Sequence, residues 1–187
     1  MSFFQNTVVE KYLNDINKKK IKEAYDKFIT HFHNPTIQQN IRNSKEEQYQ
    51  EGFLRDLFVN ILGYTLNPQN NFNLTTEYKN VKDSKKADGA IVLNKRVYDK
   101  GACSLGKGAP DKEAYSRVIG VIELKGTDTT DLSKIETQAF GYKNNQPDCI
   151  YIITSNFEKL RFYIDNAIEY IEFNLFTLTE KQFELLY

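Results

Sequence analysis

Apolar residues follow a helical period in the first third of the chain. Between residues 8 and 33 they recur on one helix face, at Val9, Tyr12, Leu13, Ile16, Ile21, Tyr25, Phe28, Ile29 and Phe32. The Asn34-Pro35 pair ends this segment, because a residue before proline disfavours the helical conformation. A second helix is expected from Ser44, where the sequence SKEE is typical of a capping box, to Gly63, a residue common just after a helix.

The pattern then changes to short segments rich in β-branched and aromatic residues, as in β-strands. Strands are expected at 72–78, 86–93, 117–124, 149–154, 160–164 and 167–173, with a helix at 131–145 between the third and fourth. A hairpin turn is expected at Asp165-Asn166. This order predicts an α/β fold with a mixed central sheet flanked by helices. Residues 44–187 are expected to form this domain, and residues 1–43 an N-terminal helical extension.

Residues 94–116 interrupt the strand pattern. They are rich in Gly and Lys and have no sustained period, so we expect a loop or hairpin insertion between two neighbouring strands. Within them, Gly101–Lys107 matches the G-x-x-x-x-G-K pattern of a nucleotide-binding P-loop. Gly108, however, stands where that motif needs a Ser or Thr hydroxyl for the metal ion, so a P-loop is disfavoured.

Composition narrows the class of protein. A chain of 187 residues, 40% of them apolar, is long enough for one globular domain. It has neither an apolar run of about 20 residues nor a signal-peptide pattern, so a cytoplasmic protein without a membrane segment is expected. Cys103 and Cys149 lack the spacing of a zinc site or a disulfide scaffold. Basic and acidic residues are balanced at 25 each, so DNA binding would need help from another module.

Candidate catalytic groups lie at the ends of two expected strands. Asp88 lies near the start of one strand, and Glu123-Leu124-Lys125 closes the next. Strand alternation places Glu123 and Lys125 on one face. If the strands are neighbours, Asp88 converges on the same point, and two carboxylates with a main-chain carbonyl form an oxygen site suited to Mg²⁺. The simpler alternative is a structural Glu–Lys pair.

Helical residues add to this group. Gln138 and Tyr142 are one turn apart in the helix after Lys125, so they share a face, and both side chains can hydrogen-bond phosphate oxygens. Glu51, in the helix expected to flank the sheet, is a further candidate for reaching a metal ion. Considered singly, each has a plainer interpretation as a surface or half-buried side chain.

Taken in order, these motifs resemble the PD-(D/E)XK nuclease superfamily, in the branch with a Q-x-x-x-Y motif. The resemblance rests on Glu51 with GFLRDLFVNILGY, Asp88 in ADGAIV, VIELKGTDTTDL, QAFGY and ITSNFEKLRFY, and it covers roughly residues 45–165. Within that branch the chain resembles the N-terminal nuclease domain of type IIG or type I restriction-modification enzymes. The resemblance implies a restriction-endonuclease-like fold and a Mg²⁺-dependent DNA endonuclease, with Mn²⁺ able to substitute.

The resemblance also implies residue roles. Its metal ligands would be Asp88, Glu123, the carbonyl of Leu124 and Glu51. Lys125 would serve the attacking water, and Gln138 and Tyr142 would steady the DNA backbone. The products would carry 5′-phosphate and 3′-hydroxyl ends.

Two departures from the superfamily pattern concern the first acid. Ala87 takes the place of proline, and 35 residues separate Asp88 from Glu123, so Asp83 is kept as a second candidate. The partners implied are double-stranded DNA, methyltransferase and target-recognition modules (fused or separate), and a second copy in a transient dimer when both strands are cut. A catalytically silent DNA- or subunit-binding module on the same fold is the main alternative. An RNase or repair nuclease of the superfamily is a further one.

Overall fold

The computed structural model describes residues 6–79, 85–95 and 115–187. Its centre is a six-stranded sheet in the order β1 (Leu74–Lys79), β2 (Lys86–Lys95), β3 (Tyr115–Leu124), β4 (Tyr151–Ser155), β5 (Lys159–Ile164) and β6 (Tyr170–Asn174). Neighbouring strands are antiparallel except β3 and β4, which are parallel. The predicted α/β fold with a mixed sheet is confirmed, and each expected strand is present.

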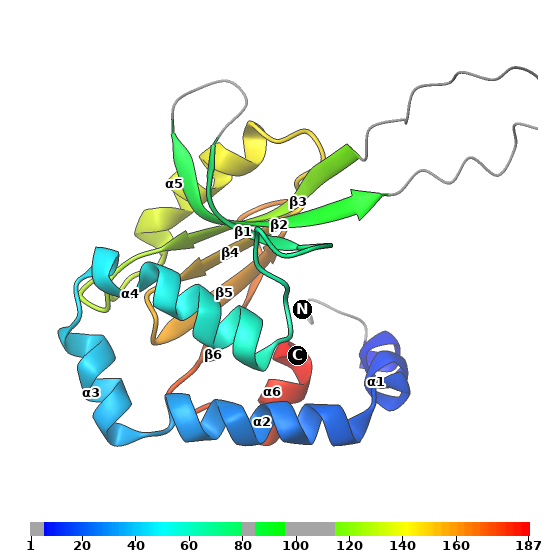
Figure 1. Cartoon of the computed structure of the whole chain (residues 1–187), viewed down its shortest axis with the longest axis vertical. Coiled ribbons are helices and arrows are strands. Elements are labelled where there is room, and N and C mark those ends of the chain that lie inside the picture. The colour runs from blue at the N-terminus through cyan, green and yellow to red at the C-terminus, as the bar shows by residue number, and fades with distance from the viewer. Residues whose placement is uncertain (1–5, 80–84, 96–114) are drawn as a thin grey trace, which may run out of the picture.

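Helices cover both faces of this sheet (Figure 1). On one face lies α5 (Ser133–Asn144), which connects β3 to β4, because parallel neighbours need a crossover. The other face carries α2 (Lys18–Phe32), α4 (Glu46–Phe53), its continuation as the π-helix η1 (Leu54–Ile61), and α6 (Glu180–Leu186). The remaining helices are α1 (Asn6–Asp15) and α3 (Pro35–Asn43). Among the described residues, none of the helices is both long and apolar enough to cross a bilayer.

Two apolar cores lie on the two faces. The larger one joins the sheet to η1, α6 and α2, whose residues Ile21, Phe28 and Phe32 are buried in it. The smaller one lies under α5 and includes Val121, Ala139 and Tyr142. Because α2 shares the larger core, part of the N-terminal region packs against the sheet.

The N-terminal helical region is divided differently from the prediction. The helix expected over 8–33 is two helices, because the Asn17 side chain caps a new start by accepting the backbone N–H of Lys19 at 3.1 Å. Asn34 likewise accepts the N–H of Thr36 at 2.9 Å, so Asn34-Pro35 ends α2 and also begins α3. The helix α3 was not predicted from the sequence.

The capping box expected at Ser44 is wrong. The Ser44 hydroxyl donates to the carbonyl of Asn40, and the reciprocal contact is made one residue later, where Gln48 Oε1 accepts the N–H of Lys45 at 2.8 Å. The helical segment ends as predicted at Gly63, whose φ of 78° is the left-handed conformation that glycine adopts without strain.

Several expectations concern loops. Pairing of β2 with β3 continues to Lys95 opposite Tyr115, so the described ends of the predicted 94–116 insertion are adjacent. Residues 96–114, including the P-loop-like Gly101–Lys107, lie outside the described residues, as does Asp83. The turn expected at Asp165-Asn166 belongs to a longer connection, because β5 pairing ends at Tyr163 opposite Tyr170.

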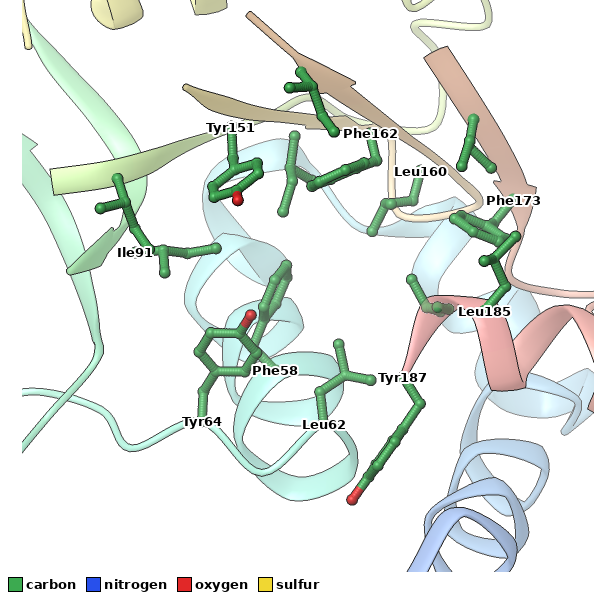
Figure 2. Close-up of a pocket in the computed structure, with 15 residues that line it drawn as sticks. Phe58, Leu62, Tyr64, Ile91, Tyr151, Leu160, Phe162, Phe173, Leu185 and Tyr187 are labelled. Carbon is green, nitrogen blue, oxygen red and sulfur yellow. The ribbon is translucent and has the colours of Figure 1, made fainter. Parts of the chain in front are cut away.

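An apolar cavity of about 450 Å³ lies on the η1 and α6 face (Figure 2). Its walls include Phe58 and Tyr64 near the end of η1, Tyr151 and Phe162 on the sheet, and Tyr187 after α6. It is on the opposite side of the sheet from α5.

Candidate active site

Asp88 and Glu123 come from neighbouring antiparallel strands and lie at the same end of them. Gly89 pairs with Ile122, which places the two acids side by side at the next position. Asp88 Oδ2 accepts the backbone N–H of Leu124 at 2.7 Å, so this carboxylate also bridges the two strands. The structure therefore brings together the two acids that the sequence suggested.

Glu123 is a buried carboxylate with unsatisfied hydrogen-bonding capacity. Its side chain is 1% exposed, and Oε2 has no hydrogen-bond partner among the described residues. Burial raises the pKa of Glu123 to about 7, and the nearby Asp88 carboxylate adds to the shift. Burial also raises the pKa of Asp88, although the Leu124 N–H and Lys125 oppose it. An orphaned buried acceptor of this kind is costly unless a proton or a cation satisfies it.

Lys125 links the strand end to a helix. Its Nζ donates to Glu123 Oε1 at 3.0 Å and to Glu46 Oε1, at the start of α4, at 3.1 Å. Burial alone would lower the pKa of Lys125, but the two glutamates outweigh it and raise the pKa above its ordinary value. Lys125 is therefore a cation and a hydrogen-bond donor at neutral pH, not a base.

Glu46, and not Glu51, is the helical glutamate at this site. Glu51 is exposed and accepts hydrogen bonds from Arg55 at 2.8 and 3.0 Å. The two glutamates are five residues apart, so they point in different directions around the helix. Glu46 is oriented by Gln50, whose Nε2 donates to Glu46 Oε1 at 3.0 Å. In the sequence, the only sign of this role was that Glu46 and Gln50 are one helical turn apart at the start of α4, and it was not used in the prediction.

Gln138 and Tyr142 are brought to the same site by α5. Gln138 Nε2 donates to the Tyr142 hydroxyl at 3.1 Å. Tyr142 is buried in the core under α5, and burial raises its pKa, with the Glu123 and Asp88 carboxylates contributing in the same direction. Gln138 is exposed. Of the two, only Gln138 therefore presents its side chain to solvent.

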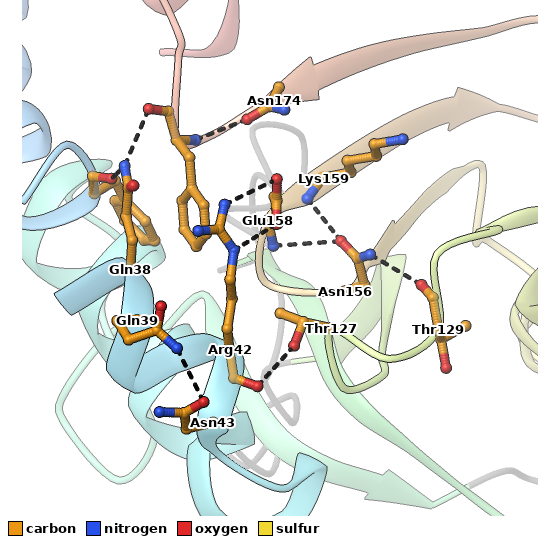
Figure 3. Close-up of polar contacts among 12 residues, drawn as sticks. Gln38, Gln39, Arg42, Asn43, Thr127, Thr129, Asn156, Glu158, Lys159 and Asn174 are labelled. Carbon is orange, nitrogen blue, oxygen red and sulfur yellow. Dashed lines mark hydrogen bonds and ion pairs between the residues drawn. The ribbon is translucent and has the colours of Figure 1, made fainter. Parts of the chain in front are cut away.

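The loop after Lys125 is held by a polar network that the sequence analysis did not identify (Figure 3). The Thr127 hydroxyl donates to the carbonyl of Arg42 at 3.2 Å, and Asn156 Nδ2 donates to the carbonyl of Thr129 at 2.9 Å. The backbone N–H of Lys125 donates to the carbonyl of Ser155 at 2.9 Å, which extends the β3–β4 ladder. These contacts fix the backbone of Lys125 between the sheet and α3.

The donor set was compared with the needs of a hard metal ion. In the part of the chain that the structure describes, no group of three or more His, Cys, Asp or Glu side chains has an arrangement that could hold a metal. Lys125 lies between Glu46 and Glu123 and already binds both. Mg²⁺, however, commonly uses only one or two protein carboxylates and keeps several waters. Asp88 and the orphaned oxygen of Glu123 fit that smaller requirement.

Comparison with known proteins does not identify the chain. No protein-family model matches it, and no curated protein or solved structure is significantly similar to it. Its function must therefore be inferred from its own residues.

We expect Glu123→Gln to stabilise the protein more at pH 8 than at pH 5. Folding raises the pKa of Glu123 from 4.5 to about 7. Between these two pH values the folded state keeps a proton on Glu123 that the unfolded chain releases. The stability that the protonated Glu123 allows is fully present below pH 4.5 and is lost as the pH rises through 7. Glutamine does not ionise and avoids that loss. Urea unfolding of both proteins in EDTA at pH 5 and pH 8 measures the difference in their free energies of unfolding.

The matched control is Glu51→Gln, since Glu51 is exposed. Its effect on the free energy of unfolding should not change between the two pH values. A constant difference between Glu123→Gln and the unmodified protein would show that burial does not perturb Glu123.

Proposed function

We propose that this chain is a Mg²⁺-dependent DNA endonuclease domain of a cytoplasmic restriction-modification enzyme, of the type IIG or type I kind, on a restriction-endonuclease-like fold. The observation that carries the proposal is the meeting of Asp88, Glu123 and Lys125 at one strand end, with a buried Glu123 oxygen that lacks a partner. Two acids and a lysine in this arrangement match the chemical needs of phosphodiester hydrolysis.

Asp88, Glu123 and the carbonyl of Leu124 are the groups proposed to hold Mg²⁺. When bound, the ion supplies an activated water and neutralises charge on the phosphate. Lys125 remains protonated, because its pKa is raised, so it orients the water and stabilises negative charge as the phosphorus–oxygen bond breaks. The cut leaves a 5′-phosphate and a 3′-hydroxyl.

The helical residues position these groups. Glu46 accepts a hydrogen bond from Lys125 Nζ at 3.1 Å and so orients the lysine. The metal-ligand role expected for Glu51 is not carried into this proposal, because Glu51 is exposed and pairs with Arg55. Gln138 is exposed and is suited to donate its amide N–H to a phosphate oxygen, and its hydrogen bond to the Tyr142 hydroxyl orients it. The proposed partners are duplex DNA and methyltransferase and target-recognition modules, with a second domain when both strands are cut.

One observation favours the alternative, a silent binding module. Lys125 Nζ forms ion pairs with both Glu46 and Glu123, one oxygen of each. Such an ion cluster could serve only to hold α4 against the sheet. A DNA cleavage assay distinguishes the nuclease from the silent binding module.

The test is incubation of the protein, at high concentration, with unmethylated supercoiled plasmid and Mg²⁺ or Mn²⁺. We expect nicked and then linear plasmid, no product in EDTA, and nicks that DNA ligase seals directly because they carry 5′-phosphate and 3′-hydroxyl ends. Binding of plasmid by folded protein with no nicking under either metal would favour the silent module.

A further inference from the structure

A polar hollow of about 640 Å³ lies along α5, beside the candidate active site. It is lined by Lys85, which precedes β2, and by Lys134, Thr137, Gln138, Gly141, Tyr142 and Asn145 on and after α5. We call this surface the α5 hollow. Tyr142 lines the α5 hollow and is close enough to Glu123 and Asp88 for both carboxylates to raise its pKa, so the hollow borders the candidate site.

The lining of the α5 hollow is positively charged and rich in hydrogen-bond donors. Lys85 and Lys134 are both exposed, Thr137 and Gln138 are exposed and polar, and no acidic residue takes part in the lining. Lys85 and Lys134 are thus the charged groups of the lining, and both are cationic. Such a lining suits the phosphate oxygens of a polyanion.

Gly141 lets a ligand approach the helix closely. A Cβ built at Gly141 would have nothing within 4 Å, so the space above the helix backbone is open there. Lys134 and Gly141 are roughly 10 Å apart along the helix axis. That length corresponds to about three base-pair steps of duplex DNA.

We propose that the α5 hollow binds the backbone of one strand of duplex DNA next to the phosphate that is cut, with Lys85 and Lys134 each contacting a phosphate. This inference rests on the proposed function, because the α5 hollow shares Gln138 with the cleavage site. Tyr142 is the aromatic residue of the lining and is buried, so the hollow lacks the stacking surface that single-strand binders use. Binding through phosphates is independent of base sequence.

The experiment is fluorescence anisotropy of a short labelled duplex with the whole chain, in EDTA to prevent cleavage, at several salt concentrations. The double variant Lys85→Gln, Lys134→Gln should bind about tenfold more weakly. The slope of log affinity against log salt should fall by about 1.8, since each lost phosphate contact removes about 0.9. The matched control is Lys27→Gln, Lys181→Gln, which changes two exposed lysines on α2 and α6, across the sheet, and should bind as the unmodified protein does.

The outcomes separate this inference from the proposed function. Unchanged affinity and slope in the Lys85, Lys134 variant, with plasmid cleavage by the unmodified protein, would overturn the role of the α5 hollow and leave the nuclease standing. Weakened duplex binding without cleavage under any metal would support the α5 hollow and contradict the nuclease. An unmodified protein that does not bind duplex, or that binds single strands as tightly, would overturn the inference.

Discussion

The variant Asp88→Asn is expected to cut DNA about a thousandfold more slowly than the unmodified protein, or not at all. The change removes one of the two negative charges proposed to hold the metal ion, and losses of this size follow when a charged group of the reaction centre is removed. Asparagine has the same shape, and its side-chain oxygen can still accept the Leu124 N–H that Asp88 accepts at 2.7 Å. The fold should therefore survive, and the rate of cleavage of a labelled duplex with enzyme in excess measures the loss.

The matched control for this variant is Asp165→Asn. Asp165 follows β5, at the opposite end of the sheet from the β3 terminus, and its φ of 65° is one that asparagine adopts readily. Asp165 is exposed in its ion pair with Lys143, and a solvent-screened pair of this kind contributes little. Asp165→Asn should cleave at the unmodified rate. Equal cleavage by Asp88→Asn and the control would remove Asp88 from the site.

Phe53→Ala is expected to destabilise the protein by about 3–5 kcal/mol, the usual cost of removing a buried ring from a core. Phe53 is fully buried, and its ring lies 5.3 Å from that of Phe157 and 6.2 Å from that of Phe32. These contacts join α4 to α2 and to the loop after β4. For a chain of this length the melting temperature should fall by about 6–20 °C, as measured by circular dichroism or calorimetry.

The control for Phe53 is Ile168→Ala, because Ile168 is 85% exposed. Its melting temperature should stay close to that of the unmodified protein. A small loss for Phe53→Ala would mean that α4 is not held by this aromatic cluster, and the position of Glu46 would then need another explanation.

The sheet could be predicted because its strands are short apolar runs separated by polar segments. β4, for example, is the run YIITS, which cannot be mistaken for a surface helix. The helices were harder to predict. α3 has the sequence PTIQQNIRN, with only Ile37 and Ile41 apolar, so its period could not be recognised. The break at Asn17 depends on a side-chain cap, which apolar spacing does not reveal.

The candidate site could be predicted where it depends on strand geometry. Alternation and neighbouring strands place Asp88, Glu123 and Lys125 together, and the structure shows that arrangement. Which glutamate of α4 faces the site depends on the direction in which each side chain points around the helix. The sequence prediction chose Glu51, which is exposed, whereas Glu46, five residues earlier, contacts Lys125. The supporting contact of Asn156 with Thr129 joins residues 27 apart in sequence, a tertiary contact that local patterns cannot supply.

We propose that the cluster of Asp88, Glu123 and Lys125 at the ends of β2 and β3 cuts DNA with a divalent ion. The most direct measurement is a time course of supercoiled plasmid with Mn²⁺, run in parallel with equally purified unmodified protein and Asp88→Asn. We expect nicked circles to accumulate with the unmodified protein and not with the variant. Nicking at the same rate in both, or in neither, would contradict it.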